Sequence, residues 1–155
     1  MADLIYRAAR ADELAAVLAF WQVAAENDSR PADTTAAVEA LHRRDPGALI
    51  LAVDGDEIVG TVIAGWDGWR CHLYRLAVAP WRRREGIGGR LIAAAEGRFT
   101  DFGGTRADAM VLDENEAAHG IWAAQGYGRQ PEWSRWVKPL PPATGYPQPG
   151  EPGCG

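Results

Sequence analysis

The sequence predicts one α/β domain, built on a mixed β-sheet with about four helices around it. Three observations carry this prediction. Strand-like apolar runs alternate with helical patterns, two Asp-Gly pairs join three consecutive strand-like runs, and a glycine-rich turn links the third run to a helix. A chain of 155 residues has the length of one domain and can bury a sizeable core.

The N-terminal part of the chain predicts one strand and two helices. Residues 4–8 form a short strand, and Asp12 is expected to cap the first helix. Apolar residues then recur at helical spacing and turn one face inward: Leu14, Val17, Leu18 and Trp21. A second helix is expected from Thr34 or Thr35 to a stop at Asp45-Pro46. Its apolar face is thin, which favours a place over an opening rather than in the core.

The middle of the chain predicts an antiparallel meander. Three strand-like runs cover residues 48–53, 57–66 and 69–78. Asp54-Gly55 and Asp67-Gly68 separate them, and such pairs are typical of tight hairpin turns. The three strands should therefore pair in sequence order.

The C-terminal part adds a helix over residues 86–102, a strand over 107–112, a helix over 115–125 and a last strand over 133–137. Because a helix connects them, the strand over 107–112 should run parallel to the strand that ends at Val78. From residue 139 the chain is rich in Pro and Gly. The expected division is a domain over residues 4–138 and a tail over 139–155.

Composition limits the possible partners. The net charge of -5 argues against a broad basic surface for nucleic acid. No run approaches the ~20 apolar residues of a membrane span, and the first ten residues do not resemble a signal peptide. Two cysteines and three scattered histidines have no metal-ligand or disulfide spacing. We therefore expect a cytoplasmic protein with no metal, membrane or nucleic-acid partner.

The glycine-rich turn spans residues 83–91 (RREGIGGRL) between the third strand and a helix. Its glycines leave backbone amides accessible, and a helix N-terminus favours an anion such as pyrophosphate. The dinucleotide fingerprint does not fit, because Leu91 stands where its last glycine belongs. A P-loop does not fit either, because no lysine follows Gly88.

The turn fills the pattern Q/R-x-x-G-x-G/A with Arg83, Gly86 and Gly88. This resembles the acetyl-CoA loop of the GCN5-related N-acetyltransferases (GNAT). A second stretch, N-x-x-A-x-x-x-W-x-x-x-G-Y from Asn115 to Tyr127, resembles that family's C-terminal motif. The order of elements over residues 4–138 is similar to the GNAT fold, whose parallel strand pair splays apart. The stretch over residues 60–68 (GTVIAGWDG) is similar to small bacterial members.

The resemblance implies acetyl-CoA as donor and an amine as acceptor. By position, the pyrophosphate would lie on the loop amides of Arg83, Arg84, Glu85, Gly86, Ile87, Gly88 and Gly89. The pantetheine would pair with the backbone of Leu76, Ala77 and Val78. The amide of Val78 would polarise the thioester carbonyl, with Asn115 and Trp122 near the cofactor arm.

Two positions depart from the family pattern. Trp122 replaces the tyrosine that often protonates the leaving thiolate, so Tyr127 or Tyr74 would have to substitute. His72, eleven residues before Arg83, stands where histone-type members carry a glutamate base. His72 could equally be a packed or surface residue without a catalytic role.

A histidine base favours a weakly basic acceptor. Neutralising a lysine amine at pH 7 costs about 4.6 kcal/mol, against about 1 kcal/mol for an α-amine. We expect a small-molecule amine or a peptide N-terminus, near Trp21, Trp66, Trp69 and Glu26, although the aromatics could simply pack and Glu26 could lie in a solvated loop. The alternative function is an acyl-CoA-binding regulatory domain with little catalysis. An exposed sheet edge would allow a homodimer.

Overall fold

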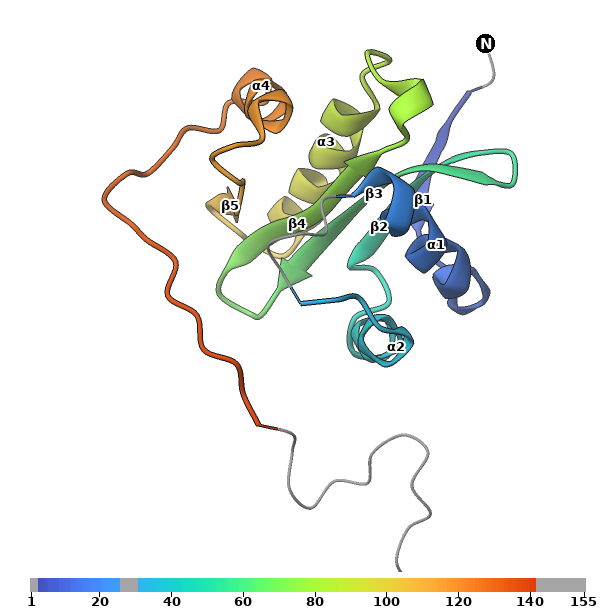
Figure 1. Ribbon diagram of the computed structural model, residues 1–155, viewed down its shortest axis with the longest axis horizontal. Helices are drawn as coiled ribbons and strands as arrows, with labels where there is room; N and C mark the ends of the chain where they lie inside the picture. Colours follow the sequence, from blue (N-terminus) through green and yellow to red (C-terminus); the bar gives the residue numbers. More distant parts are fainter. Residues whose placement is uncertain (1–2, 26–30, 142–155) are drawn as a thin grey trace, which may run out of the picture.

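The computed structural model describes residues 3–25 and 31–141, and in it a single twisted sheet runs through the molecule (Figure 1). The strand order is β1-β2-β3-β4-β5, with these bounds: β1 Ile5–Ala8, β2 Leu49–Asp54, β3 Glu57–Trp66, β4 Cys71–Val78 and β5 Ala107–Ala109. The first four strands pair antiparallel, and β5 lies parallel to β4. The predicted meander and the parallel pair are both confirmed.

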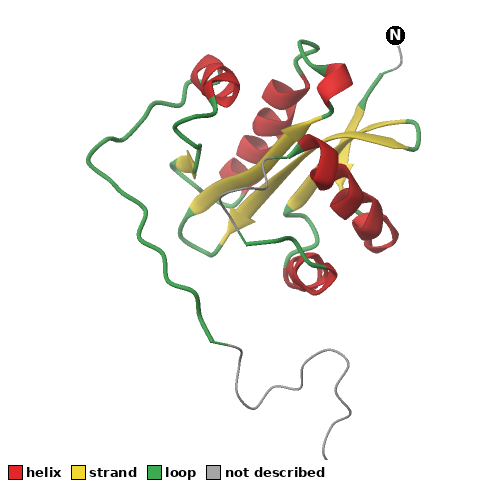
Figure 2. Cartoon of the chain, in the orientation of Figure 1, coloured by secondary structure: helices red, strands yellow, loops and turns green. Residues whose placement is uncertain are grey.

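Helices cover both faces of the sheet (Figure 2). Helices α1 (Leu14–Ala24) and α2 (Thr35–Arg44) lie on one face, and α3 (Ile87–Asp101) crosses the other. Helix α4 (Glu116–Ala124) follows β5 and contacts α3. Short 3-10 turns cover Ala11–Glu13 and Pro80–Arg82. The four α-helices and the mixed sheet match the predicted fold class.

The start of α1 differs from the expected cap. Helix α1 begins at Leu14 after the 3-10 turn, so Asp12 caps nothing and instead pairs with the Arg10 side chain at 3.3 Å. The carboxylate of Glu13 accepts the Arg10 amide at 2.9 Å and also binds the Arg7 guanidinium. The hydrogen bond from Arg7 lowers the pKa of Glu13 to about 2. The prediction that Asp12 caps the first helix was wrong, because the Arg7 guanidinium and the Arg10 amide bind the carboxylate of the next residue, Glu13.

The C-terminal strands are shorter than expected. Strand β5 ends at Ala109 instead of residue 112, and residues 133–137 form no strand. Trp133 and Trp136 have the β-propensity that led to the prediction, yet they are 75% and 93% exposed. In the described part of the chain β5 is therefore the edge strand of the sheet. Of the expected tail, residues 142–155 lie outside the described part.

A bulge in β4 determines on which face of the sheet the side chains after it lie. The β3–β4 register shifts between Thr61 and Ile63, and opposite this point Arg75 has φ +52°. Strand side chains normally alternate between faces, but here Tyr74 and Arg75 both line one pocket on the α1 and α2 face. The bulge thus brings two consecutive polar side chains to one side of the sheet.

Candidate functional site

The turn between β4 and α3 presents backbone amides to solvent. Gly86, the residue before α3, has φ +77°, and no side chain caps the first turn of this helix. Arg84 also has a positive φ, +66°, so two residues of this short turn adopt the left-handed backbone conformation. The first amides of α3 thus have no intrahelical acceptor and carry the positive end of the helix dipole. Such a turn can hold a phosphate or pyrophosphate.

The arginines beside this turn have different roles. Arg82 forms ion pairs with Asp54 at 2.9 Å and with Glu85 at 2.8 Å. The hydrogen bonds from Arg82 lower the pKa of Glu85 and keep this acid charged and engaged. Arg83 and Arg84 are exposed. Arg82 therefore stiffens the turn, while Arg83 and Arg84 supply charge that an anion can meet.

The edge of β4 beyond β5 exposes its own backbone groups. The β4–β5 ladder ends where Leu73 pairs with Ala109, so residues 76–78 extend past it. The Ala79 amide donates to Val59 of β3 at 2.8 Å. Because strand amides alternate in direction, the amides of Leu76 and Val78 point to the opposite edge, away from β3. An extended ligand arm can pair there as an added strand.

Helix α4 lies beside the free edge of β4 and the start of α3. A side-chain carbon added at Gly88 would lie 3.4 Å from Ile121 of α4 and 3.7 Å from Val78 of β4. The α3 N-terminus, the end of β4 and α4 thus converge at Gly88. Asn115 caps α4, since its Oδ1 accepts the Ala118 amide at 3.2 Å. The predicted cofactor contact of Asn115 would have to coexist with this cap.

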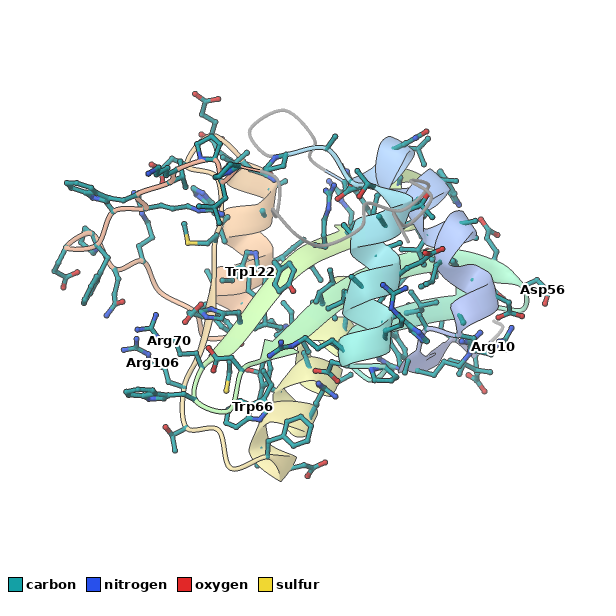
Figure 3. The ribbon with its side chains drawn as sticks, turned by 90° about the horizontal axis from the view of Figure 1, so that it is seen from below. Arg10, Asp56, Trp66, Arg70, Arg106 and Trp122 are labelled. Carbon is teal, nitrogen blue, oxygen red and sulfur yellow. The ribbon has the colours of Figure 1, made fainter. Side chains whose placement is uncertain are left out.

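Trp122 and Tyr127 pack against each other beneath α4. Trp122 is buried and points from α4 toward the sheet (Figure 3), with its ring 5.0 Å from that of Tyr127. The Tyr127 hydroxyl donates to Glu96 of α3 at 3.1 Å. Burial, with Glu96 beside it, raises the pKa of Tyr127 well above its usual value. Tyr127 is therefore held on the α3 side, away from the face that carries Tyr74.

His72 and Tyr74 lie on the face that α1 and α2 cover. In the β3–β4 ladder His72 pairs with Gly65, and Tyr74 pairs with Ile63. The ring of Tyr74 passes 3.1 Å from where a side-chain carbon at Gly65 would lie. Burial raises the pKa of Tyr74, so its hydroxyl stays protonated at neutral pH. Two predicted proton carriers thus share this face.

A pocket of about 170 Å³ opens on the same face, between α1, α2 and the sheet. Its lining combines aromatic, aliphatic and polar side chains: Trp21, Asp33, Thr34, Ala37, Val38, Leu41, Ile63, Tyr74 and Arg75. Asp33 pairs with Arg75, whose guanidinium lies 5.1 Å from the centre of the Trp21 ring. The Trp21 indole donates to Thr61 at 2.9 Å, and Thr61 donates to the Arg75 carbonyl at 2.9 Å. The expectation that α2 lies over an opening is confirmed.

The other predicted acceptor residues lie elsewhere. Trp66 stacks on Phe102, with ring centres 5.7 Å apart, at the C-terminal end of α3. Trp69 is 87% exposed in the turn before β4. Glu26 lies outside the described residues. Trp21 is thus the predicted acceptor residue that lines the pocket.

Sequence reasoning missed three charged residues near this face. Asp33 and Arg75 form the ion pair at the pocket wall, and Asp108 of β5 contacts His72. The predicted parallel pairing of the two strands indicated that Asp108 could lie near His72, but the sequence does not give the register that sets these two residues opposite each other.

Among residues 3–25 and 31–141, no three His, Cys, Asp or Glu side chains gather as a metal site would need. No helix in that part is long and apolar enough to cross a membrane.

Known proteins are similar to this chain in sequence and in fold. The profile of the acetyltransferase (GNAT) family matches residues 8–127. An acetyltransferase from Pectobacterium atrosepticum is 32% identical over 119 residues, which cover 76% of this chain and 83% of the relative.

Solved structures match the fold at low identity. An aminoglycoside antibiotic 6'-N-acetyltransferase from Acinetobacter haemolyticus has a TM-score of 0.67 at 17% identity, covering 88% of this chain and 99% of that one. The NatC complex bound to a Gag peptide and CoA has a TM-score of 0.67 at 17% identity, covering 83% and 86%. Since the family profile and the bacterial relative both cover most of the sequence, the chain belongs to the acetyltransferase (GNAT) family and is an acetyl-CoA-dependent N-acetyltransferase.

Proposed function

We propose that this protein transfers the acetyl group of acetyl-CoA directly to a primary amine, either of a small molecule or of a peptide N-terminus, within a ternary complex. One observation carries the proposal. The outward amides of β4 and the uncapped start of α3 meet at Gly88, while His72 and Tyr74 stand on the adjoining face of the same strand. Donor and acceptor would thus meet across β4.

The donor would be held mainly by backbone groups. The pyrophosphate would accept hydrogen bonds from the loop amides of residues 83–89, with Arg83 and Arg84 adding attraction. The pantetheine would pair with the outward edge of residues 76–78. The Val78 amide would then donate to the thioester carbonyl oxygen, where negative charge develops as the amine attacks. A backbone donor of this kind is already oriented before the substrate binds.

The proton transfers would involve His72 and Tyr74. His72 would accept a proton from the amine, directly or through water, as the amine nitrogen attacks the carbonyl carbon. The carbon–sulfur bond then breaks and CoA leaves as a thiolate, which costs only about 2 kcal/mol at pH 7 for a thiol of ordinary pKa. Tyr74 is better placed than Tyr127 to protonate it, because Tyr127 donates to Glu96.

The acceptor would approach from the pocket beside Tyr74. Its aliphatic lining and Trp21 suit an apolar group next to the amine. The structural neighbours named above act on an aminoglycoside or bind a peptide, which supports both acceptor classes without choosing between them. A histidine base favours the more weakly basic α-amine over a lysine side chain.

An amine panel tests this proposal. Leucinamide and phenylalaninamide offer only an α-amine, whereas Nα-acetyl-lysinamide offers only an ε-amine. We expect CoA release at pH 7 to be on the order of 100-fold faster with the α-amines, since far more of each α-amine is neutral. Activity confined to the ε-amine would overturn the assignment of the acceptor. Acetyl-CoA binding without transfer to any amine would favour the regulatory alternative, which Trp122 in place of tyrosine supports.

A further inference from the structure

His72 is held by a carboxylate from the neighbouring strand. Its Nδ1 lies 2.5 Å from Oδ1 of Asp108, the residue paired with it in the parallel β4–β5 ladder. Both side chains are partly open to solvent, at 42% and 44% exposed. The contact therefore lies at the surface, open to solvent and not locked in the core.

The backbone fixes this contact from both strands. His72 and Asp108 are direct partners in the ladder, and the flanking residues Cys71 and Leu73 are buried on the opposite face. Side chains that are opposite in a ladder and on one face meet without any rearrangement. On its other side His72 faces Gly65, which has no side chain to compete for the imidazole.

The contact decides which imidazole nitrogen is free. An ionised carboxylate only accepts hydrogen bonds, so Nδ1 must carry the proton that binds Asp108. In the neutral ring Nε2 then holds the lone pair and can accept a proton. The other nearby carboxylate, Asp67, accepts the amides of Trp69 and Arg70 in its own turn. Asp67 is thus engaged by backbone, and Asp108 is the acid that contacts the ring.

We propose that Asp108 is a positioning residue that holds His72 with Nδ1 protonated and Nε2 free to take the proton of the acceptor amine. This inference rests on the proposed function of His72 as the base. In the reaction the amine proton moves to Nε2 and the ring becomes an imidazolium that still donates from Nδ1 to Asp108. Release of the Nε2 proton to solvent restores the starting state, so Asp108 itself neither gains nor loses a proton.

The tautomer can be measured without substrate. In 15N-labelled protein, long-range 1H–15N spectra at a pH where the rings are neutral report which nitrogen carries the proton. We expect His72 to be protonated at Nδ1 in the native chain, and to lose this preference in Asp108→Ala. Asp108→Asn should keep the native tautomer, because its amide oxygen can still accept from Nδ1.

The same spectra contain an internal reference and allow a matched control. His42, whose ring lies 3.1 Å from the Ala9 carbonyl, should not change in any of these variants. Asp113→Asn removes a carboxylate that follows β5 in the chain and pairs with Arg129, not with His72, so it should leave the His72 signals unchanged. Unchanged His72 signals in Asp108→Ala would overturn the proposal and leave the contact as a simple tie between strands.

Steady-state kinetics test whether the tautomer of His72 affects turnover. We expect Asp108→Ala to lower kcat by about 10- to 100-fold with KM for acetyl-CoA unchanged, and Asp108→Asn to recover most of that loss. Combined with His72→Gln, Asp108→Ala should cause no further loss, because the two act as one unit. Additive losses would contradict a positioning role. Full turnover by His72→Gln would instead refute the proposed base, while the spectra would still decide the tautomer.

Discussion

Replacing Gly86 with glutamate is expected to weaken acetyl-CoA binding by at least about 100-fold, as measured by calorimetry. Gly86 has φ +77°, a conformation that costs a residue with a side chain about 1–2 kcal/mol. The new carboxylate would also stand at the start of α3, where the amides and the helix dipole would otherwise attract pyrophosphate. Strain and like-charge repulsion thus act together at one position.

Gly103→Glu is the matched control for this substitution. Gly103 also has a positive φ, +85°, and open space around it, but it follows the C-terminal end of the same helix. We expect this variant to lose a similar amount of stability in thermal unfolding and to keep its affinity for acetyl-CoA. If both variants bind acetyl-CoA as the native chain does, the pyrophosphate does not lie on this turn.

His72→Gln is expected to lower kcat by about 10²- to 10³-fold at pH 7, the usual loss when a general base is removed. Glutamine has a comparable size and can still hydrogen-bond to Asp108, but it cannot take a proton at neutral pH. KM for acetyl-CoA should not change, because the donor would be held by backbone groups of other residues. Steady-state rates with leucinamide would measure both quantities.

His42→Gln provides the comparison for loss of a histidine as such. His42 lies on α2 with its ring against the Ala9 carbonyl, outside the proposed donor and acceptor contacts. Its replacement should leave kcat within about twofold of native, because His42 contacts none of the groups proposed to bind substrates or to move a proton. Equal losses in both histidine variants would mean that the His72 effect reports general damage and not catalysis.

The fold was largely predictable because its signals are local. The Asp-Gly pairs marked the meander, and the helix between β4 and β5 required a parallel pairing. The errors arose where contacts between distant residues determine the local structure. The Arg7 and Arg10 contacts select Glu13 over Asp12, and residues 133–137 form no strand beside β5. Neither effect has a signature in the nearby sequence.

The candidate site divides in the same way. The glycine turn and the edge of β4 follow from sequence spacing, because backbone amides form them. The acceptor face depends on the bulge at Arg75, which places Tyr74 and Arg75 on one side, and on the register that sets Asp108 against His72. A one-residue difference in either would reverse the faces. The predicted role of Trp66 in the acceptor pocket failed for the same reason, since its ring stacks on Phe102, which is distant in the sequence.

The central claim is direct transfer within a ternary complex, and a grid of initial rates over acetyl-CoA and leucinamide concentrations tests it most directly. Cys71, the thiol in the described part of the chain, is buried, and burial raises its pKa, so it is a poor nucleophile. We predict double-reciprocal lines that intersect, because both substrates must be bound before CoA leaves. Parallel lines would indicate a covalent acetyl-enzyme and contradict the mechanism.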